Sequence, residues 1–330
     1  MTASPVPRPL LRANDLTKHY PAGNSLFARQ RKPVIAVDGV SLEIFPGETL
    51  GVVGESGCGK STLGRCLIRL AELTSGRLEF EGADISRASQ SRLRPLRRQM
   101  QMVFQDPSAS LNPRRRVGDL LADPFRIHEK LSGSEVADRV AALMQRVELL
   151  PEHARKYPHE FSGGQRQRIG IARALALRPR LIVADEPVSA LDVSVQAQIV
   201  NLFADLRDEL GLTYVFIAHD LAVVRQISTR VAVMYLGSIV ETGPSEQVFA
   251  TPRHHYTAAL RSAVPGTRGA VRPSGRTILA GDVPNPSNPP DGCRFHTRCP
   301  AVQARCKAER PLLTAVGDGQ LVACHFPVLV

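Results

Sequence analysis

The stretch GESGCGKST, from Gly54 to Thr62, decides the class of fold to which this chain belongs. Glycines at this spacing let backbone N–H groups turn inward around phosphate oxygens, where any Cβ would clash. The lysine neutralises phosphate charge, and the hydroxyl that follows it is a ligand for Mg²⁺. The sequence therefore predicts a phosphate-binding loop for ATP and Mg²⁺, formed by Gly54, Glu55, Ser56, Gly57, Cys58, Gly59, Lys60, Ser61 and Thr62.

The residues on either side of this loop have the pattern that such a loop requires. The short apolar run 49–53 predicts a buried strand that leads directly into it. Leu63, Leu67 and Leu70 recur at helical spacing, which predicts a helix from Ser61 to about Leu70 with its positive N-terminus at the phosphates. This strand and helix favour a nucleotide site over a glycine-rich turn that binds nothing.

Two adjacent carboxylates follow a second apolar run. The strand-like residues 181–184 lead directly into Asp185 and Glu186. Adjacent carboxylates at the buried end of a strand repel each other, so we expect a cation nearby. The natural division places Asp185 in the Mg²⁺ shell and makes Glu186 the group that polarises the attacking water. Alone, this pair would be an ordinary strand end, but its order after the phosphate loop favours catalysis.

A third motif lies between these two. Phe161 precedes Ser162, Gly163, Gly164 and Gln165, and the residues that follow have a helical pattern to about position 177. Serine is a favoured helix N-cap, and two glycines at a helix N-terminus expose backbone amides to an anion. One chain thus carries two phosphate-binding ends, and two copies facing head to tail could each complete the site of the other.

The organisation of the chain indicates an α/β fold. Residues 10–53 are rich in strand patterns, and helix and strand alternate again from Arg168, which predicts a mostly parallel sheet. Between them, residues 106–161 begin rich in proline and continue as an amphipathic helix from Ser134 to about Leu150. Residues 264–292 resemble a linker, and residues 293–330 form a separate unit with four of the six cysteines.

The formal charge of +11 favours an anionic partner, such as a nucleotide, a nucleic acid or a membrane surface, but a basic surface that only aids solubility fits it as well. No aromatic residues interleave with the basic clusters, which disfavours a nucleic-acid groove. No apolar run approaches the length of a membrane span, and the N-terminus lacks the apolar core of a signal peptide. We therefore expect a cytosolic chain that reaches a membrane only through another chain, and cysteines that are thiols or metal ligands.

These motifs resemble those of the ATP-binding cassette (ABC) proteins over residues 10–250, with a helical subdomain at about 106–165. The resemblance implies a P-loop NTPase core with a mostly parallel sheet, an N-terminal antiparallel β subdomain and a helical signature subdomain. It makes residues 162–165 the signature that meets the γ-phosphate of the opposing subunit. It also implies roles for four single residues, which are Tyr20 (adenine stacking), Gln105 (Mg²⁺ sensing and contact with the membrane partner), Asp192 (the loop that crosses the dimer interface) and His219 (the γ-phosphate switch). Taken singly, the tyrosine could be a surface aromatic, the glutamine an edge-strand cap and the histidine structural.

The resemblance narrows to the dipeptide and oligopeptide importers through residues 105–113, residues 157–164 and the cysteine-bearing extension at 251–330. Residues 57–65 are closer to the second of the two ATPase subunits of that branch. This implies a heterodimer with a related ATPase, two transmembrane permease subunits, an extracytoplasmic substrate-binding protein and a place at the cytoplasmic face of the inner membrane. A soluble ABC ATPase that acts on nucleic acid is the alternative, but such proteins carry long coiled-coil or zinc-bearing insertions that this chain lacks.

Four cysteines cluster in the extension, at Cys293, Cys299, Cys306 and Cys324. Four thiolates can ligate a [4Fe–4S] cluster or a tetrahedral zinc ion, and the spacing here differs from the short pairs of zinc ribbons. Related importers with this tail hold an iron–sulfur cluster, so the resemblance implies the same here. Packed, reduced thiols remain the alternative, and nearby His296 and His325 keep the ligand set open.

Overall fold

The structure is a computed structural model that describes residues 8–21, 32–263, 279, 281–317 and 319–329. It divides into two compact units, unit 1 (Met1–Arg87 with Ala218–Val330) and unit 2 (Ala88–Ile217). The N-terminal residues on which the absence of a signal peptide was predicted, and much of the linker predicted at 264–292, lie outside the described residues.

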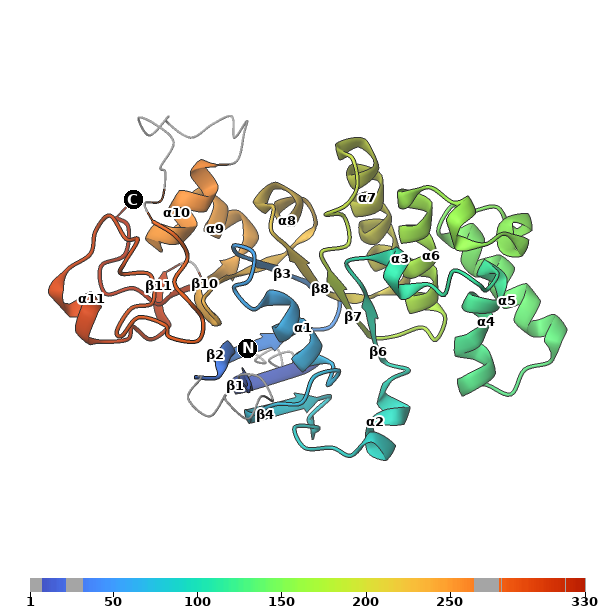
Figure 1. The fold of residues 1–330 in the computed structure, drawn as a ribbon, viewed down its shortest axis with the longest axis horizontal. Helices are drawn as coiled ribbons and strands as arrows, with labels where there is room; N and C mark the ends of the chain where they lie inside the picture. Colours follow the sequence, from blue (N-terminus) through green and yellow to red (C-terminus); the bar gives the residue numbers. More distant parts are fainter. Residues whose placement is uncertain (1–7, 22–31, 264–278, 280, 318, 330) are drawn as a thin grey trace, which may run out of the picture. The chain divides into compact units, whose positions relative to one another are not determined.

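Unit 1 contains an antiparallel sheet with the strand order β2-β1-β4-β5 (Figure 1). Along β1, Leu11 and Ala13 are buried whereas Arg12 and Asn14 are exposed, which is the alternation of a sheet with one face on a core. This sheet confirms the predicted N-terminal antiparallel β subdomain. Its strands are β1 (Leu11–Tyr20), β2 (Val34–Ile44), β4 (Ser75–Phe80) and β5 (Ala83–Asp84).

The second sheet of unit 1 is mixed. Strand β3 (Thr49–Val53) is buried along its whole length and pairs in parallel with β9 (Arg230–Tyr235). A Cβ on Gly51 would lie 2.3 Å from Val224, so this glycine lets helix α8 (Leu221–Ile227) approach the strand closely. The other helices of unit 1 are α1 (Lys60–Leu67), α9 (Ser245–Ala250), α10 (His255–Ser262) and α11 (Ala304–Ala308).

The C-terminal extension predicted at residues 251–330, called the tail below, is part of unit 1. Strand β10 (Ser238–Pro244) pairs antiparallel with β9 and with β12 (Gln320–Val322), which in turn pairs with β11 (Thr314–Gly317). The carboxylate of Glu241 on β10 is fully buried and accepts hydrogen bonds from the backbone N–H groups of Arg253 and His254. The structure thus differs from the expectation of a separate unit at 293–330, because two tail strands continue the sheet.

Unit 2 is built on three parallel strands in the order β6-β7-β8. They are β6 (Met100–Val103), β7 (Leu181–Asp185) and β8 (Thr213–Ala218), and β7 is buried throughout. Phe203 of α7 packs edge-on against Tyr214 and Phe216 of β8. The helices are α2 (Gln90–Leu96), α3 (Pro107–Ser110), α4 (Val117–His128), α5 (Gly133–Arg146), η2 (Pro151–Arg155), η3 (Pro158–Glu160), α6 (Gly163–Leu175) and α7 (Val193–Leu210) (Figure 1, green tones).

Two predicted helices are shorter than their apolar pattern indicated. Helix α1 ends at Leu67 because Arg69 adopts a left-handed φ of 55°, and Leu70 is 46% exposed rather than on the buried face. Helix α5 ends at Arg146, ahead of a left-handed φ of 57° at Glu148. A single residue in the left-handed region ends a helix without changing the spacing of the apolar residues. The apolar periodicity alone therefore predicted both helices to end later than they do.

Candidate nucleotide-binding and hydrolysis site

The phosphate loop lies in unit 1, between β3 and α1. Gly59 caps α1 with a left-handed φ of 104°, and Lys60 opens the helix as a buried residue. Its Nζ donates hydrogen bonds to the backbone oxygens of Gly54 (2.8 Å) and Glu55 (3.0 Å). The loop therefore curls around its own ammonium group, which brings a positive charge to the place where the sequence predicted phosphate binding.

Two glycines of the loop are required by the main chain around them. A Cβ on Gly54 would lie 2.1 Å from the backbone oxygen of Met234, and one on Gly59 would lie 1.9 Å from that of Ala36. A backbone atom cannot move aside as a flexible side chain can, so no other residue fits. Cys58 is buried, and burial raises the pKa of its thiol, which agrees with a packing role.

The loop residues fit a nucleotide with Mg²⁺ on three observations. A buried ammonium lies in the loop, glycines admit the main chain at close range, and the hydroxyl of Ser61 stands in the first turn of α1. Mg²⁺ prefers oxygen ligands of this hard type, and a helix N-terminus favours an anion.

Tyr20 and His219 lie at strand ends. Tyr20 closes β1 with 38% of its surface exposed, and the Lys18 ammonium lies 4.8 Å from its ring centroid. An exposed ring beside a cation is available for stacking on an adenine base. His219 is exposed directly after β8 and precedes Asp220, which caps α8. Their proposed contacts with nucleotide stay predictions.

Unit 2 brings Gln105 and Glu186 together. They follow β6 and β7, which are neighbouring parallel strands, and Gln105 Nε2 donates to Glu186 Oε2 at 3.1 Å. Asp185 is buried at the end of β7, and Glu186 has a left-handed φ of 46° with its backbone N–H bonded to the oxygen of Ile217 (3.0 Å). A non-glycine residue held in this region marks a position where side-chain placement matters.

The signature residues form the start of α6. Ser162 is the N-cap, with Gln165 N donating to Ser162 Oγ (3.3 Å) and Ser162 N donating to Gln165 Oε1 (3.0 Å). This capping box confirms the predicted cap and adds its reciprocal half. A Cβ on Gly164 would lie 2.5 Å from Val195, so the glycine lets α6 approach α7 closely.

Asp192 has a structural task in its own chain. Its Oδ1 accepts hydrogen bonds from Val195 N (3.0 Å) and Ser194 Oγ (2.8 Å), which cap α7 and hold the pKa of the carboxyl below its usual range. Gln196 Nε2 bonds to the backbone oxygens of Val188 and Leu191 and so braces the same loop. An aspartate just before an apolar helical pattern is a known N-cap signal, so the capping role of Asp192 could also have been predicted from the sequence.

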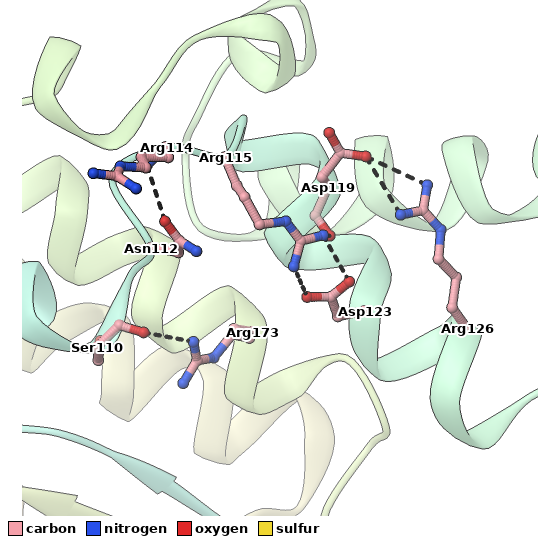
Figure 2. Close-up of polar contacts among 8 residues, drawn as sticks. All are labelled: Ser110, Asn112, Arg114, Arg115, Asp119, Asp123, Arg126 and Arg173. Atoms are coloured by element: carbon pink, nitrogen blue, oxygen red, sulfur yellow. Dashed lines mark hydrogen bonds and ion pairs between the residues drawn. The ribbon is translucent and has the colours of Figure 1, made fainter.

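Arg173 is a residue that the sequence did not single out. It lies on α6, donates from Nη1 to the backbone oxygen of Ser110 (2.8 Å), and has its pKa lowered by burial (Figure 2). This bond ties the signature helix to α3, which follows Gln105. Ser110 and Arg173 are 63 residues apart in the chain, and no local sequence pattern predicts their contact.

Two further residues that the sequence missed hold Glu55 of the phosphate loop. The guanidinium of Arg298 makes two bonds to its carboxylate, and the Tyr256 hydroxyl accepts from its backbone N–H. Both partners lie in the C-terminal tail, more than 200 residues along the chain.

The four tail cysteines line one small cavity of about 10 Å³, together with His296 and His325. Burial raises the pKa of the thiols of Cys293, Cys299 and Cys324, and neighbouring thiols add to the effect. Among the described residues, however, no group of three or more histidine, cysteine or acidic side chains is arranged to hold a metal ion. Four thiols are the kind of ligand that an iron–sulfur cluster needs, but these side chains are not arranged in space to hold a metal ion. The predicted iron–sulfur cluster is therefore not supported.

Within the described residues, no helix combines the length and the apolar character needed to cross a membrane.

Two family models match this chain. The model described as "ABC transporter" matches residues 37–189, and "Oligopeptide/dipeptide transporter, C-terminal region" matches residues 240–306. Together with the phosphate loop, the Asp185–Glu186 strand end and the signature helix, they define an ATPase of the ABC class with the P-loop NTPase fold.

Curated relatives narrow the class. The chain is 52% identical to the oligopeptide transport ATP-binding protein AppF of Bacillus subtilis over 96% of this chain and 97% of that protein. It is 51% identical to the di/tripeptide transport ATP-binding protein DppF of Pseudomonas aeruginosa, over 96% and 97%. This chain therefore belongs to the family of oligopeptide and dipeptide ABC transporter ATP-binding proteins.

Solved structures agree with the class. The protein cbiO1 of Clostridium perfringens, part of the ABC transporter complex cbiONQ, aligns with a TM-score of 0.64 at 29% identity over 73% of this chain and 91% of that one. A dimeric ATP-binding cassette in a post-hydrolysis state, bound to ADP and phosphate, aligns with a TM-score of 0.63 at 30% identity over 71% and 98%.

Proposed function

We propose that this chain hydrolyses ATP to energise the uptake of dipeptides and oligopeptides through separate permease subunits. The observation that carries the proposal is the direct bond between Gln105 and Glu186, which joins the residue expected to sense the membrane partner to the expected catalytic base. The peptide class rests on the family of the tail and on the relatives' names. On this proposal the cassette spans residues 10–250, with its helical subdomain at about 106–165, and the extension spans residues 251–330.

Each residue of the site has a task in hydrolysis. With ATP and Mg²⁺ bound, Lys60 and the loop amides would bind the β- and γ-phosphates, and Ser61, Asp185 and Gln105 would be the residues that hold Mg²⁺. Bound Mg²⁺ supplies charge neutralisation on the phosphate oxygens. Glu186 accepts a hydrogen bond from the attacking water and orients it, and His219 donates to the γ-phosphate.

The proposal includes a second ATPase subunit, because the signature serves the opposing site. Ser162, Gly163, Gly164 and Gln165 present the N-terminus of α6, a helix of 13 residues whose dipole favours a phosphate. The dimer of the solved relative supports pairing in this class. We infer a heterodimer with a paralogous ATPase, with the loop at Asp192 at the interface between the two.

The permease contact is expected on unit 2. A groove of about 380 Å³ lies between α4, α5 and η2, with apolar walls that include Val136 and Val140, and with Arg116, Arg126 and Arg155 among its lining residues. Figure 2 shows two ion pairs along α4, one between Arg115, just before the helix, and Asp123, and one within the helix between Arg126 and Asp119. An apolar groove edged by arginines fits a helix that carries both apolar and acidic side chains.

The bond from Arg173 to Ser110 supports transmission from this surface. It links the segment between Gln105 and α4 to the signature helix, so a permease that shifts this segment also acts on α6. The subunit would then work at the cytoplasmic face of the inner membrane, in a complex that includes an extracytoplasmic substrate-binding protein.

Purification from membranes tests this proposal. A tagged chain, isolated in mild detergent, is expected to retain two integral-membrane subunits and a second ATP-binding chain, identified by mass spectrometry. Reversing the charge at the groove with R126E should reduce permease recovery, whereas R77E, on β4 of unit 1, should not.

The nucleic-acid alternative has no support from the comparisons, and the same preparation can test it. We expect no tight binding to duplex DNA and no stimulation of ATPase activity by DNA. Permease-free preparations whose ATPase activity rises with DNA, in a strongly salt-dependent manner, would contradict the transporter proposal.

Metal binding by the four tail cysteines is a separate property from transport. The [4Fe–4S] cluster expected on Cys293, Cys299, Cys306 and Cys324 stays a proposal: all four line one cavity, but no group of three or more donors among the described residues is arranged to hold a metal ion. Anaerobic purification followed by iron and sulfide analysis decides the matter. Colourless protein that holds zinc, or no metal, removes the cluster and leaves the transport function untouched.

A further inference from the structure

Residues of the C-terminal tail bind Glu55 of the phosphate loop. Arg298 Nη1 lies 2.7 Å from Glu55 Oε2 and Nη2 lies 3.1 Å from Oε1, so the guanidinium meets the carboxylate with two parallel bonds. Only 7% of the Arg298 side chain is exposed, and 26% of that of Glu55. An arginine–carboxylate pair with two parallel hydrogen bonds is stronger and more directional than an exposed surface ion pair.

The main chain of Glu55 is held as well. Its backbone N–H donates to the hydroxyl of Tyr256 at 2.8 Å, and Tyr256 is fully buried. Tyr235 and Phe295 pack against the Tyr256 ring, with centroids 4.8 Å and 5.5 Å away. The tail therefore fixes both the backbone and the side chain of the residue that follows Gly54.

This arrangement answers an electrostatic difficulty. Glu55 places a negative charge in a loop whose ligand carries several negative charges, and its backbone oxygen is already a partner of Lys60. Like charges a few ångströms apart repel each other, and the repulsion is several times stronger near a protein surface than in water. A free Glu55 carboxylate would compete with the nucleotide for Lys60, whereas a carboxylate bound to Arg298 is neutralised.

We propose that Arg298 is a positioning residue for ATP binding, because its pair with Glu55 keeps that carboxylate from opposing the nucleotide phosphates. The tail is then a working part of the nucleotide site, not only an addition to the cassette. The inference rests on ATP binding at the loop and is independent of the transported substrate. The residues that carry it are Arg298, Glu55 and Tyr256, none of which is a proposed ligand of a metal at the cysteines.

A double-mutant cycle in the full-length chain tests this inference. The affinity for ATP is measured with Mg²⁺ for wild type, R298Q, E55Q and R298Q/E55Q, and thermal unfolding without nucleotide is recorded for each. We expect R298Q to weaken ATP binding by about tenfold, the equivalent of one charge-assisted hydrogen-bond pair. In the E55Q background the same substitution should change affinity by less than about twofold, because no carboxylate is left to neutralise.

The matched control is R305Q. Arg305 lies in the same tail and pairs with Glu309 at 2.8 Å, far from the loop in its contacts, so its loss should leave ATP affinity unchanged. A purely structural Arg298 would give equal losses in the wild-type and E55Q backgrounds. That result, or unaltered affinity in R298Q, overturns the inference.

A second variant covers the case in which R298Q does not fold. Lysine keeps the charge but cannot make two parallel bonds, so R298K should weaken ATP binding by about threefold, and this loss should vanish in the E55Q background. Wild-type affinity in R298K, or an equal loss in both backgrounds, contradicts the positioning role. K60A is expected to abolish binding in every background, which separates failure of this inference from failure of the loop itself.

Discussion

Glu186 is the residue on which hydrolysis depends in this account, and its surroundings leave its side chain little freedom. It follows a strand that is buried throughout, takes a left-handed φ of 46° and bonds through its backbone to Ile217. Its carboxylate is held by Gln105 at 3.1 Å. The left-handed backbone, the backbone bond to Ile217 and the bond from Gln105 together suit Glu186 to hold a water molecule in a single orientation.

The first prediction concerns this carboxylate. Glu186→Gln should retain ATP binding and lower kcat by about 10²- to 10⁴-fold, because an amide cannot accept the proton of the attacking water. The closed dimer should accumulate with ATP, which size-exclusion chromatography detects. The control is Glu152→Gln on η2, where full activity is expected; unimpaired turnover in Glu186→Gln would refute the assignment.

The second prediction concerns His254, which is fully buried in unit 1. Burial, with the charge of His255 second, lowers the pKa of its imidazole to about 3. Its Nδ1 accepts from Tyr256 N at 3.1 Å, a bond that needs the neutral ring. The unfolded chain binds this proton near pH 6.5, so the neutral histidine stabilises the fold above that pH, and the stability is lost as pH falls toward 3.

Comparison with His254→Asn isolates this effect, because asparagine can also cap α10. Between pH 6.5 and 5 the stability advantage of the wild type over the variant should shrink by about 2 kcal/mol, measured by chemical denaturation. A constant difference over this range for His254→Asn would contradict the prediction.

At the scale of elements, α6 joins the signature to its surroundings by close packing. The third prediction uses its glycines. Gly164→Ala would place a Cβ 2.5 Å from Val195 and should destabilise unit 2 by about 1–3 kcal/mol, whereas Gly170→Ala has open space and should stabilise it by up to about 1 kcal/mol.

Thermal unfolding checks the two substitutions side by side. Val195→Ala should relieve the clash and restore part of the stability of Gly164→Ala, since the contact is with a valine methyl group. If both glycine substitutions have the same sign, the close approach of α6 to α7 is not as described.

Elements were predictable where the signal is local. The strand before the phosphate loop, the cap at Ser162 and the strand that ends at Asp185 all arise from residues adjacent in the chain, and the structure confirms them. Helix ends were not, because the left-handed residues Arg69 and Glu148 carry no such pattern.

At the scale of the whole chain, contacts between distant segments escaped the sequence. Arg298 and Glu55 are 243 residues apart, and nothing in either stretch points to the other. The strands of the tail are short, and β12 takes its place only because the edge of β10 is available for pairing. The motif residues of the candidate site were predicted from the sequence, whereas the residues that hold them in place required the structure.

At the same scale, this subunit converts ATP hydrolysis into peptide uptake by other chains. The most direct test is the initial rate of labelled tripeptide uptake into proteoliposomes that contain the permeases, both ATPase subunits and the binding protein. Wild-type complex should accumulate peptide only with hydrolysable ATP, and complex with Glu186→Gln in this subunit should lose most of that uptake. Equal ATP-dependent uptake by the two complexes, or none by an actively hydrolysing wild type, would contradict the account.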